Sequence, residues 1–180
     1  MNEIIKSDYY RYFGNSISLK NKLFPPFELK YIKVMRKISL SNNKAVKFYC
    51  RYKLRKMRKI SGIDIPWTTK IGKGFYLGHY GPRIINGNVV IGNNVNIATG
   101  VTIGKTNRGK NKGTPIIGNE VWIGANSTIV GNVKIGNNVL IAPNTYVNFD
   151  VPDNSIVISP NMASIIKNNE ATKDYINRKV

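Results

Sequence analysis

The fold is decided by residues 117–147, which read IGNEVWIGANSTIVGNVKIGNNVLIAPNTYV. An aliphatic residue stands at every sixth position of this stretch: Ile117, Ile123, Ile129, Ile135, Ile141 and Val147. A period of six fits neither an α-helix, which repeats about every 3.6 residues, nor a long alternating strand, which repeats every second residue. It is typical of a coil of short strands with a tight turn after each, in which every inward residue stacks on its equivalent in the next coil.

The same spacing extends upstream of this stretch, at Ile71 and Leu77 and then at Ile85, Ile91, Ile97 and Ile103. Glycine or alanine usually follows the aliphatic residue, and asparagine is frequent beside it, as in Asn93, Asn94, Asn119, Asn137 and Asn138. Glycine and asparagine suit corners that need a positive φ. The pattern therefore predicts a parallel β-helix that begins near Ile63 and whose repeats end near Val147.

Two interruptions break the register. Leu77 and Ile85 are eight residues apart, and the irregular stretch between them contains His79 and Tyr80. Ile103 and Ile117 are fourteen residues apart, and the glycines and lysines between them predict a protruding loop.

The composition of the 180 residues restricts the chemistry. Cys50 is the only cysteine, so no internal disulfide forms and we expect a reducing compartment such as the cytoplasm. His79 is the only histidine, which removes most zinc or iron chemistry, and we predict no metal. We also expect neither a signal peptide nor the run of ~18 apolar residues that a membrane-spanning helix needs.

The net charge of +19 is concentrated at the N-terminus. Residues 1–62 hold 16 Lys and Arg against 3 Asp and Glu, a net charge of +13. Apolar spacing predicts helices over residues 28–40 and 43–60, whereas residues 1–24 show no clear period. We interpret this basic helical region first as a solvated cap on the β-helix. The alternative interpretation is that this region contacts an anionic surface, the inner membrane face. We expect no nucleic acid partner.

Four sequence blocks carry a resemblance to a known family: residues 74–79 (GFYLGH), 100–104 (GVTIG), 115–125 (PIIGNEVWIGA) and 151–155 (VPDNS). The chain resembles the hexapeptide-repeat acyltransferases, and within them the serine acetyltransferase-like branch. The resemblance implies an all-β, left-handed parallel β-helix over residues 63–158, preceded by the helical region and followed by a short tail, 159–180. It also implies a homotrimer whose active sites lie between subunits, with acetyl-CoA along the coils.

The resemblance assigns roles to particular residues. His79 matches the family's general base, and Asp64 matches the aspartate that orients it. An imidazole suits this task because a hydroxyl must lose its proton as it attacks a thioester. For acetyl-CoA the matching positions are Lys105, Ala125 and Pro143, and the backbone amide of Lys105 would face the thioester oxygen.

Two departures from the family pattern concern the acceptor. This chain has Gly78 and Gly113–Thr114 where serine acetyltransferases carry an aspartate and an Arg-His pair that bind serine. Tyr80 and Thr114 are then the candidates for contact with the acceptor. We predict O-acetylation of a sugar or cell-surface polysaccharide precursor. The alternatives are serine O-acetylation in cysteine biosynthesis and a non-catalytic β-helix that binds an anionic polymer.

Overall fold

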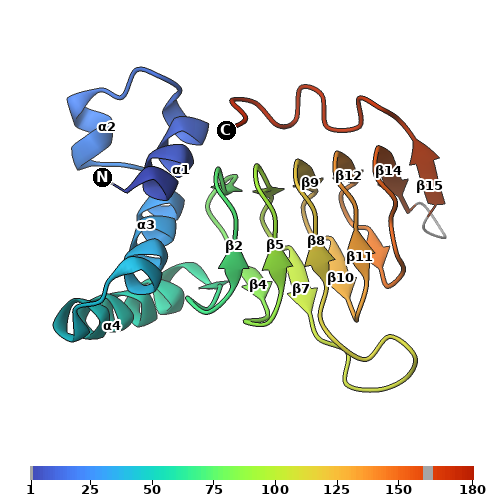
Figure 1. Cartoon of the computed structure of the whole chain (residues 1–180), viewed down its shortest axis with the longest axis horizontal. Coiled ribbons are helices and arrows are strands. Elements are labelled where there is room, and N and C mark those ends of the chain that lie inside the picture. The colour runs from blue at the N-terminus through green and yellow to red at the C-terminus, as the bar shows by residue number, and fades with distance from the viewer. Residues whose placement is uncertain (1, 160–163) are drawn as a thin grey trace.

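The computed structural model describes residues 2–159 and 164–180. A column of β-coils carries four helices at its N-terminal end, and the last residues of the chain return along the column to meet them (Figure 1). The stretch 159–163 (SPNMA), which the family resemblance places at the end of the coils, lies outside the described residues apart from Ser159.

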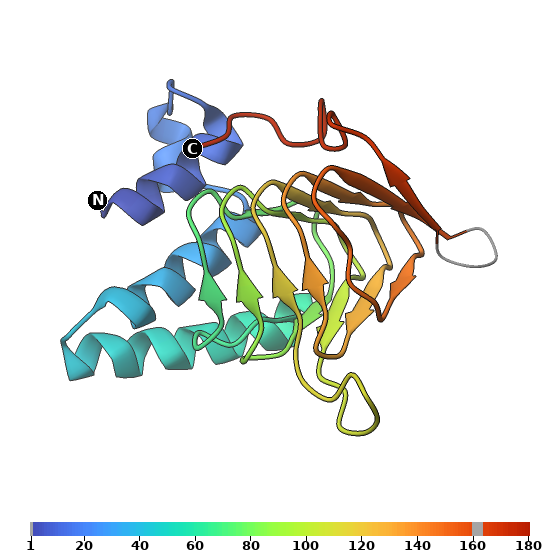
Figure 2. The same ribbon diagram turned by 45° about the vertical axis from the view of Figure 1, so that its right-hand side comes forward.

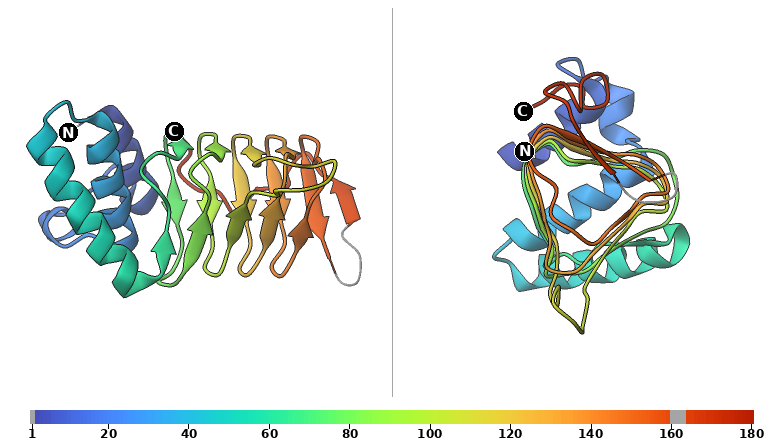
Figure 3. Two further views of the ribbon diagram at one scale, coloured as in Figure 1. Left: turned by 90° about the horizontal axis from the view of Figure 1, so that it is seen from below. Right: turned by 90° about the vertical axis from the view of Figure 1, so that its right-hand side faces the viewer.

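The column has three faces, each a sheet of short strands (Figure 3). The first face contains β1 (Ile63–Asp64), β4 (Arg83–Ile85), β7 (Thr102–Gly104), β10 (Thr128–Val130) and β13 (Tyr146–Val147). The second contains β2 (Lys70–Ile71), β5 (Val90–Ile91), β8 (Ile116–Ile117) and β11 (Lys134–Ile135). The third contains β3 (Tyr76–Leu77), β6 (Asn96–Ile97), β9 (Val121–Ile123), β12 (Val139–Ile141), β14 (Ser155–Ile158) and β15 (Ser164–Lys167).

The predicted inward residues do stack. Strand pairing is parallel throughout, apart from β14 with β15, and aligns Ile85, Ile103, Ile129 and Val147 on the first face. The second face aligns Ile71, Ile91, Ile117 and Ile135 in the same way. All these side chains are buried, so the period of six is the period of the core. The coils run one strand further than the repeat pattern predicts, since β14 pairs with β12.

The corner asparagines divide into two groups, only one of which was expected. Asn94 and Asn138 adopt the predicted left-handed backbone, with φ of 57° and 51°. Asn93, Asn119 and Asn137 instead accept hydrogen bonds through their side-chain oxygens from backbone amides of the preceding coil, each at 2.8 Å. Asp153 ends this ladder, and the hydrogen bonds from Asn137 hold the pKa of its carboxyl below the usual value. These asparagines therefore join successive coils.

The helical region contains α1 (Glu3–Phe13), α2 (Leu19–Leu23), α3 (Phe27–Leu40) and α4 (Lys44–Ser61). The last two confirm the predicted helices. The first two lie where no period was found, and α1 begins where the Asn2 side chain accepts a hydrogen bond from the amide of Ile4. Among residues 2–159 and 164–180, no helix combines the length and hydrophobicity needed to cross a membrane.

Polar side chains of α1 and α3 close the open end of the column. Asp8 forms a buried ion pair with Arg36 at 2.9 Å and also accepts a hydrogen bond from the amide of Phe75. Arg36 donates to the carbonyl oxygens of Ile71 and Gly72. The first coil has no preceding coil to pair with, and these contacts satisfy backbone groups that would otherwise be buried without partners.

The C-terminal segment is neither a free tail nor a helix. After β15, residues 168–180 run back over the third face and end beside α1 (Figure 2). Ala171, Thr172 and Ile176 are buried in this return, and Tyr175 packs on Trp122 with ring centroids 4.7 Å apart. The segment therefore covers part of the third face, whose strand β3 leads directly into the turn that contains His79.

Candidate active site

The His79 side chain projects from a strained turn between β3 and β4. His79 has φ of 62° and is exposed to solvent. A non-glycine residue in this left-handed region is uncommon and costs free energy, so the surrounding contacts must impose the conformation. The irregular spacing between Leu77 and Ile85 therefore builds a turn that presents the only imidazole of the chain.

Arg83, which was not among the predicted site residues, holds this turn from inside. Its side chain is completely buried and donates hydrogen bonds to the carbonyl oxygens of His79 (2.8 Å), Gly81 (2.9 Å) and Gly78. Burial lowers the pKa of Arg83, while the charge of Glu28 acts in the opposite direction. A guanidinium with several donors is well suited to this task, because a turn leaves several carbonyls without backbone partners.

Tyr80 connects the turn to the helical region. Its hydroxyl donates to the carbonyl oxygen of Ile60 in the last turn of α4, at 3.0 Å. Its ring packs edge-on against Phe27 of α3, with centroids 5.6 Å apart. The predicted acceptor residue Tyr80, next to His79 in the chain, is thus held against the cap and does not line the cavity described below.

A cavity of about 450 Å³ opens next to His79. Aromatic side chains make up much of its wall, contributed by α1, the third face and the returning C-terminal segment: Tyr12, Tyr76, Trp122 and Tyr175. Arg178 of that segment donates to the carbonyl oxygen of Tyr12 at 2.6 Å and fixes the segment to α1. We call this cavity the His79 pocket.

The charge of the His79 pocket is positive. Arg11 and Arg178 line it, and no Asp or Glu is among the described residues that do so. Arg11 donates to the side-chain oxygen of Asn96 at 2.5 Å, and burial lowers its pKa to about 10, so it stays protonated at neutral pH. An ammonium group would find no carboxylate in this pocket.

Asp64 does not lie against His79 in the described chain. Its carboxylate forms an ion pair with Arg58 of α4 and lines a different cavity, and no hydrogen bond of the described residues joins it to His79. In the strand register, β1 pairs with β4, which aligns Asp64 with Ile84, five residues beyond His79. The orientation of His79 by Asp64 therefore stays a prediction.

The predicted acetyl-CoA positions lie at two different corners. Ala125 and Pro143 follow β9 and β12, at the corner that leads from the third face to the first, where His79 also lies. The amide of Asn144 donates to the carbonyl oxygen of Ala125 at 2.8 Å, so this hydrogen bond joins the corners of two successive coils. Lys105 follows β7 and stands at the next corner, between the first and second faces.

The protruding loop belongs to that second corner. It leaves the column between β7 and β8, and a backbone bridge between Thr106 and Gly113 closes it (Figure 3, right). Thr114 at its base donates to the carbonyl oxygen of Asn88 at 3.3 Å. Tyr80 follows His79 directly in the chain, whereas Thr114 and Lys105 lie at another corner of the same copy. A site containing all of them needs a second copy of the chain.

Among the described residues, no group of three or more His, Cys, Asp or Glu is placed to hold a metal ion.

Known proteins share both the sequence pattern and the fold. The family "bacterial transferase hexapeptide (six repeats)" matches residues 114–148. The serine acetyltransferase of Helicobacter pylori is 36% identical over 110 residues, which are 61% of this chain and 64% of that protein. The serine acetyltransferase of Staphylococcus epidermidis is 42% identical over 101 residues, 56% of this chain and 47% of that protein. The chain thus spans less than two thirds of these relatives.

Solved structures extend the likeness to the helical region. Serine acetyltransferase isoform 3 of Entamoeba histolytica, in complex with cysteine, matches with a TM-score of 0.72 and 29% identity, over 93% of this chain and 61% of that one. The serine acetyltransferase of Neisseria gonorrhoeae, in complex with serine, matches with a TM-score of 0.73 and 28% identity, over 91% and 68%. The resemblance to hexapeptide-repeat acyltransferases of the serine acetyltransferase-like branch, and the left-handed β-helix it implies, are confirmed.

Proposed function

We propose that this protein is an acetyl-CoA-dependent O-acetyltransferase in which His79 is the general base. One observation carries the proposal: the only histidine is held in a strained turn, beside a cavity, on a solenoid similar to those of serine acetyltransferases. An imidazole nitrogen accepts the hydroxyl proton while the oxygen forms a bond to the thioester carbonyl carbon. The carbon–sulfur bond then breaks, and the imidazolium returns the proton to the leaving thiolate.

The donor lies along the His79 corner in this proposal. Ala125 and Pro143 stand on that corner in later coils, so an extended acyl thioester there would present its carbonyl toward His79. Lys105 would supply its backbone amide from a neighbouring copy. We propose the cytoplasm as the compartment in which such an enzyme meets acetyl-CoA, and a homotrimer as its assembly.

Two acceptor classes compete for the site. The relatives are named serine acetyltransferases, so they support serine as the acceptor. They give no support to the sugar acceptor predicted from the sequence. One feature of the structure favours an acceptor without an ammonium group: within one copy of the chain, no carboxylate of the described residues lines the His79 pocket. Aromatic and amide side chains, which do line it, suit the ring faces and hydroxyls of a sugar.

The acceptor prediction is tested with serine itself. We expect purified protein supplied with acetyl-CoA and serine to release CoA at close to the background rate of hydrolysis, because the ammonium group of serine lacks a partner. Thiol release measured against serine concentration is the readout, and a relative with the full serine pocket is the positive control. Saturable turnover of serine would establish the serine alternative and refute the sugar prediction.

The assembly prediction combines the trimer implied by the family resemblance with the separation of the two corners. We expect a mass of three times 20.2 kDa by light scattering, with His79 of one copy facing the loop of the next. Co-expressing His79→Asn with a variant whose loop residues 107–112 are shortened should restore about a quarter of wild-type activity, since random pairing leaves that share of sites intact. No recovery in mixed trimers, or a shortened loop that is fully active alone, would contradict a shared site.

A further inference from the structure

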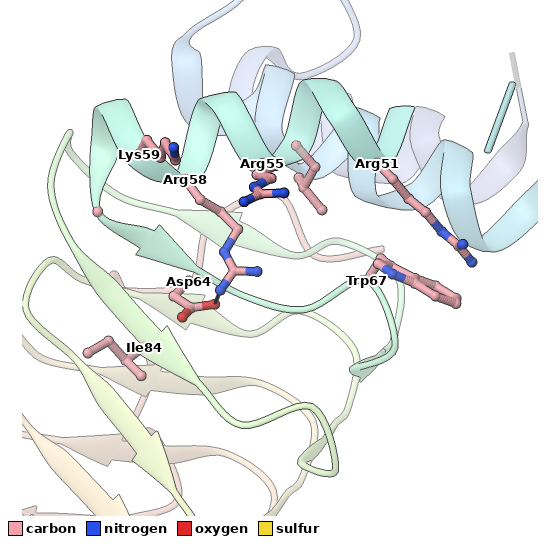
Figure 4. A pocket seen from close by; sticks show the side chains of 9 residues that line it. Arg51, Arg55, Arg58, Lys59, Asp64, Trp67 and Ile84 are labelled. Atoms are coloured by element: carbon pink, nitrogen blue, oxygen red, sulfur yellow. Dashed lines mark ion pairs between the residues drawn. The ribbon is translucent and has the colours of Figure 1, made fainter. Parts of the chain in front are cut away.

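A second cavity, of about 680 Å³, lies between α4 and the first coils. Arg51, Arg55, Arg58 and Lys59 reach it from α4, while Asp64, Trp67 and Ile84 line the opposite wall (Figure 4). We call it the α4 pocket. It is distinct from the His79 pocket, and no residue lines both.

The α4 pocket carries more positive charge than its own residues neutralise. Four cationic side chains line it against one carboxylate, Asp64, which pairs with Arg58 (Figure 4). Arg51 lies over the ring of Trp67, with its guanidinium carbon 4.6 Å from the centroid. Arg55 and Lys59 have no carboxylate partner among the described residues. A ligand that neutralises this excess must be an anion.

The spacing of these residues gathers their positive charges on one face of α4. Arg51, Arg55 and Arg58 are four and three residues apart, so they share one face of α4. The adjacent face is anchored, because Leu54 and Met57 are buried against the core. Guanidinium groups on a fixed helix form paired hydrogen bonds with phosphate oxygens, a geometry that lysine alone does not offer.

The α4 pocket adjoins the His79 turn. Gly62, one of its lining residues, accepts a hydrogen bond from the amide of Arg83, and Ile60 just before it accepts the hydroxyl of Tyr80. The pocket lies at the first coil, whereas Ala125 and Pro143 lie in later coils of the column. The His79 turn therefore lies in the same coil as the α4 pocket, at the corner on which Ala125 and Pro143 stand in later coils.

We infer that the α4 pocket binds the phosphate or diphosphate of the acceptor substrate, and so places an acceptor hydroxyl at His79. This inference rests on the proposed function, because it names the acceptor's chemical class. The acceptor is then a phosphate or diphosphate ester of a sugar. Trp67 and Ile84 add an aromatic and an exposed apolar surface for the group that the ester carries. Free serine has no phosphate and leaves this pocket empty.

Calorimetric titration with inorganic pyrophosphate tests the pocket without any acetyl transfer. We expect binding at low ionic strength that Arg55→Glu weakens by ~10-fold or more, since a paired guanidinium contact becomes a repulsive one. Lys53→Glu is the matched control: it makes the same charge change on α4, but Lys53 does not line the pocket, so we expect less than ~2-fold. An equal loss in both variants, or no binding to wild type, would overturn the inference.

Further titrations identify the ligand. UDP-glucose and farnesyl diphosphate present the same diphosphate on a nucleotide and on a lipid, and we expect Arg55→Glu to weaken whichever binds. Affinity for CoA should be unchanged in Arg55→Glu, and a ~10-fold loss would assign the pocket to the donor instead. Binding confined to phosphatidylglycerol vesicles, and weakened equally by Lys53→Glu, would make α4 a membrane surface and refute the inference. If pyrophosphate binds but no assay detects acetyl transfer, the α4 pocket is supported as an anion site and the proposed function is refuted.

Discussion

Replacing His79 with asparagine is expected to lower the rate of acetyl transfer by ~10²-fold or more, because the base that accepts the hydroxyl proton is lost. Asparagine is the substitution of choice because it tolerates the left-handed backbone, φ of 62°, that His79 adopts. The fold and the affinity for acetyl-CoA should therefore persist. Release of CoA at saturating acetyl-CoA, with the preferred acceptor, is the measurement.

Asn154→Ala is the control for turn strain, since Asn154 holds φ of 56° at a corner away from His79. It should lower stability slightly, because it also removes the hydrogen bond that Asn154 accepts from Asn138, and leave turnover intact. Asp64→Asn should cost less than His79→Asn, since Asp64 pairs with Arg58 in the described chain. Unchanged turnover in His79→Asn would remove His79 from the mechanism, however similar the fold is to acyltransferases.

Asp8→Ala should lower the free energy of unfolding by about 3–5 kcal/mol, because it leaves the buried guanidinium of Arg36 without its counter-ion. The amide of Phe75 would lose its acceptor at the same time. Denaturant unfolding followed by circular dichroism measures the change, at one fixed protein concentration because the proposed assembly is oligomeric.

Glu3→Ala is the matched control on the same helix. Glu3 pairs with Lys73 at 2.9 Å, but their side chains are 82% and 50% exposed, so we expect a much smaller loss of stability than in Asp8→Ala. Similar losses in both variants would show that the Asp8–Arg36 pair does not hold the cap on the column. A selective loss in Asp8→Ala would show that sealing the first coil is a principal source of stability.

Much of the candidate site was predictable, and the remainder depended on contacts distant in sequence. His79 and Tyr80 stand out because the regular spacing fails around them. Arg83 gave a weaker signal: it is an arginine at a position that regular alternation would bury. The residues that complete the His79 pocket, Arg11 of α1 and Tyr175 and Arg178 of the last segment, come from stretches with no period. No local pattern indicates that these stretches meet.

The pairing of Asp64 shows why spacing along the chain was insufficient. His79 lies fifteen residues after Asp64, close to one coil of the family, yet the first coil of this chain pairs Asp64 with Ile84. The extra residues of the His79 turn lengthen that coil. Arg58, from a helix that precedes the column, then takes the carboxylate. The partner of a charged side chain was decided by how the cap sits on the coil.

By itself the sequence determined the solenoid, because each coil repeats the same local requirement: a buried aliphatic residue followed by a residue small enough, or free enough in φ, to turn. Each six-residue repeat meets this requirement by itself and needs no partner far along the chain. Only the tertiary structure decided the sealed end, the returning C-terminal segment and the two separate pockets. Those features arise where buried polar groups of one segment find partners far along the chain, and such pairings leave no period in the sequence.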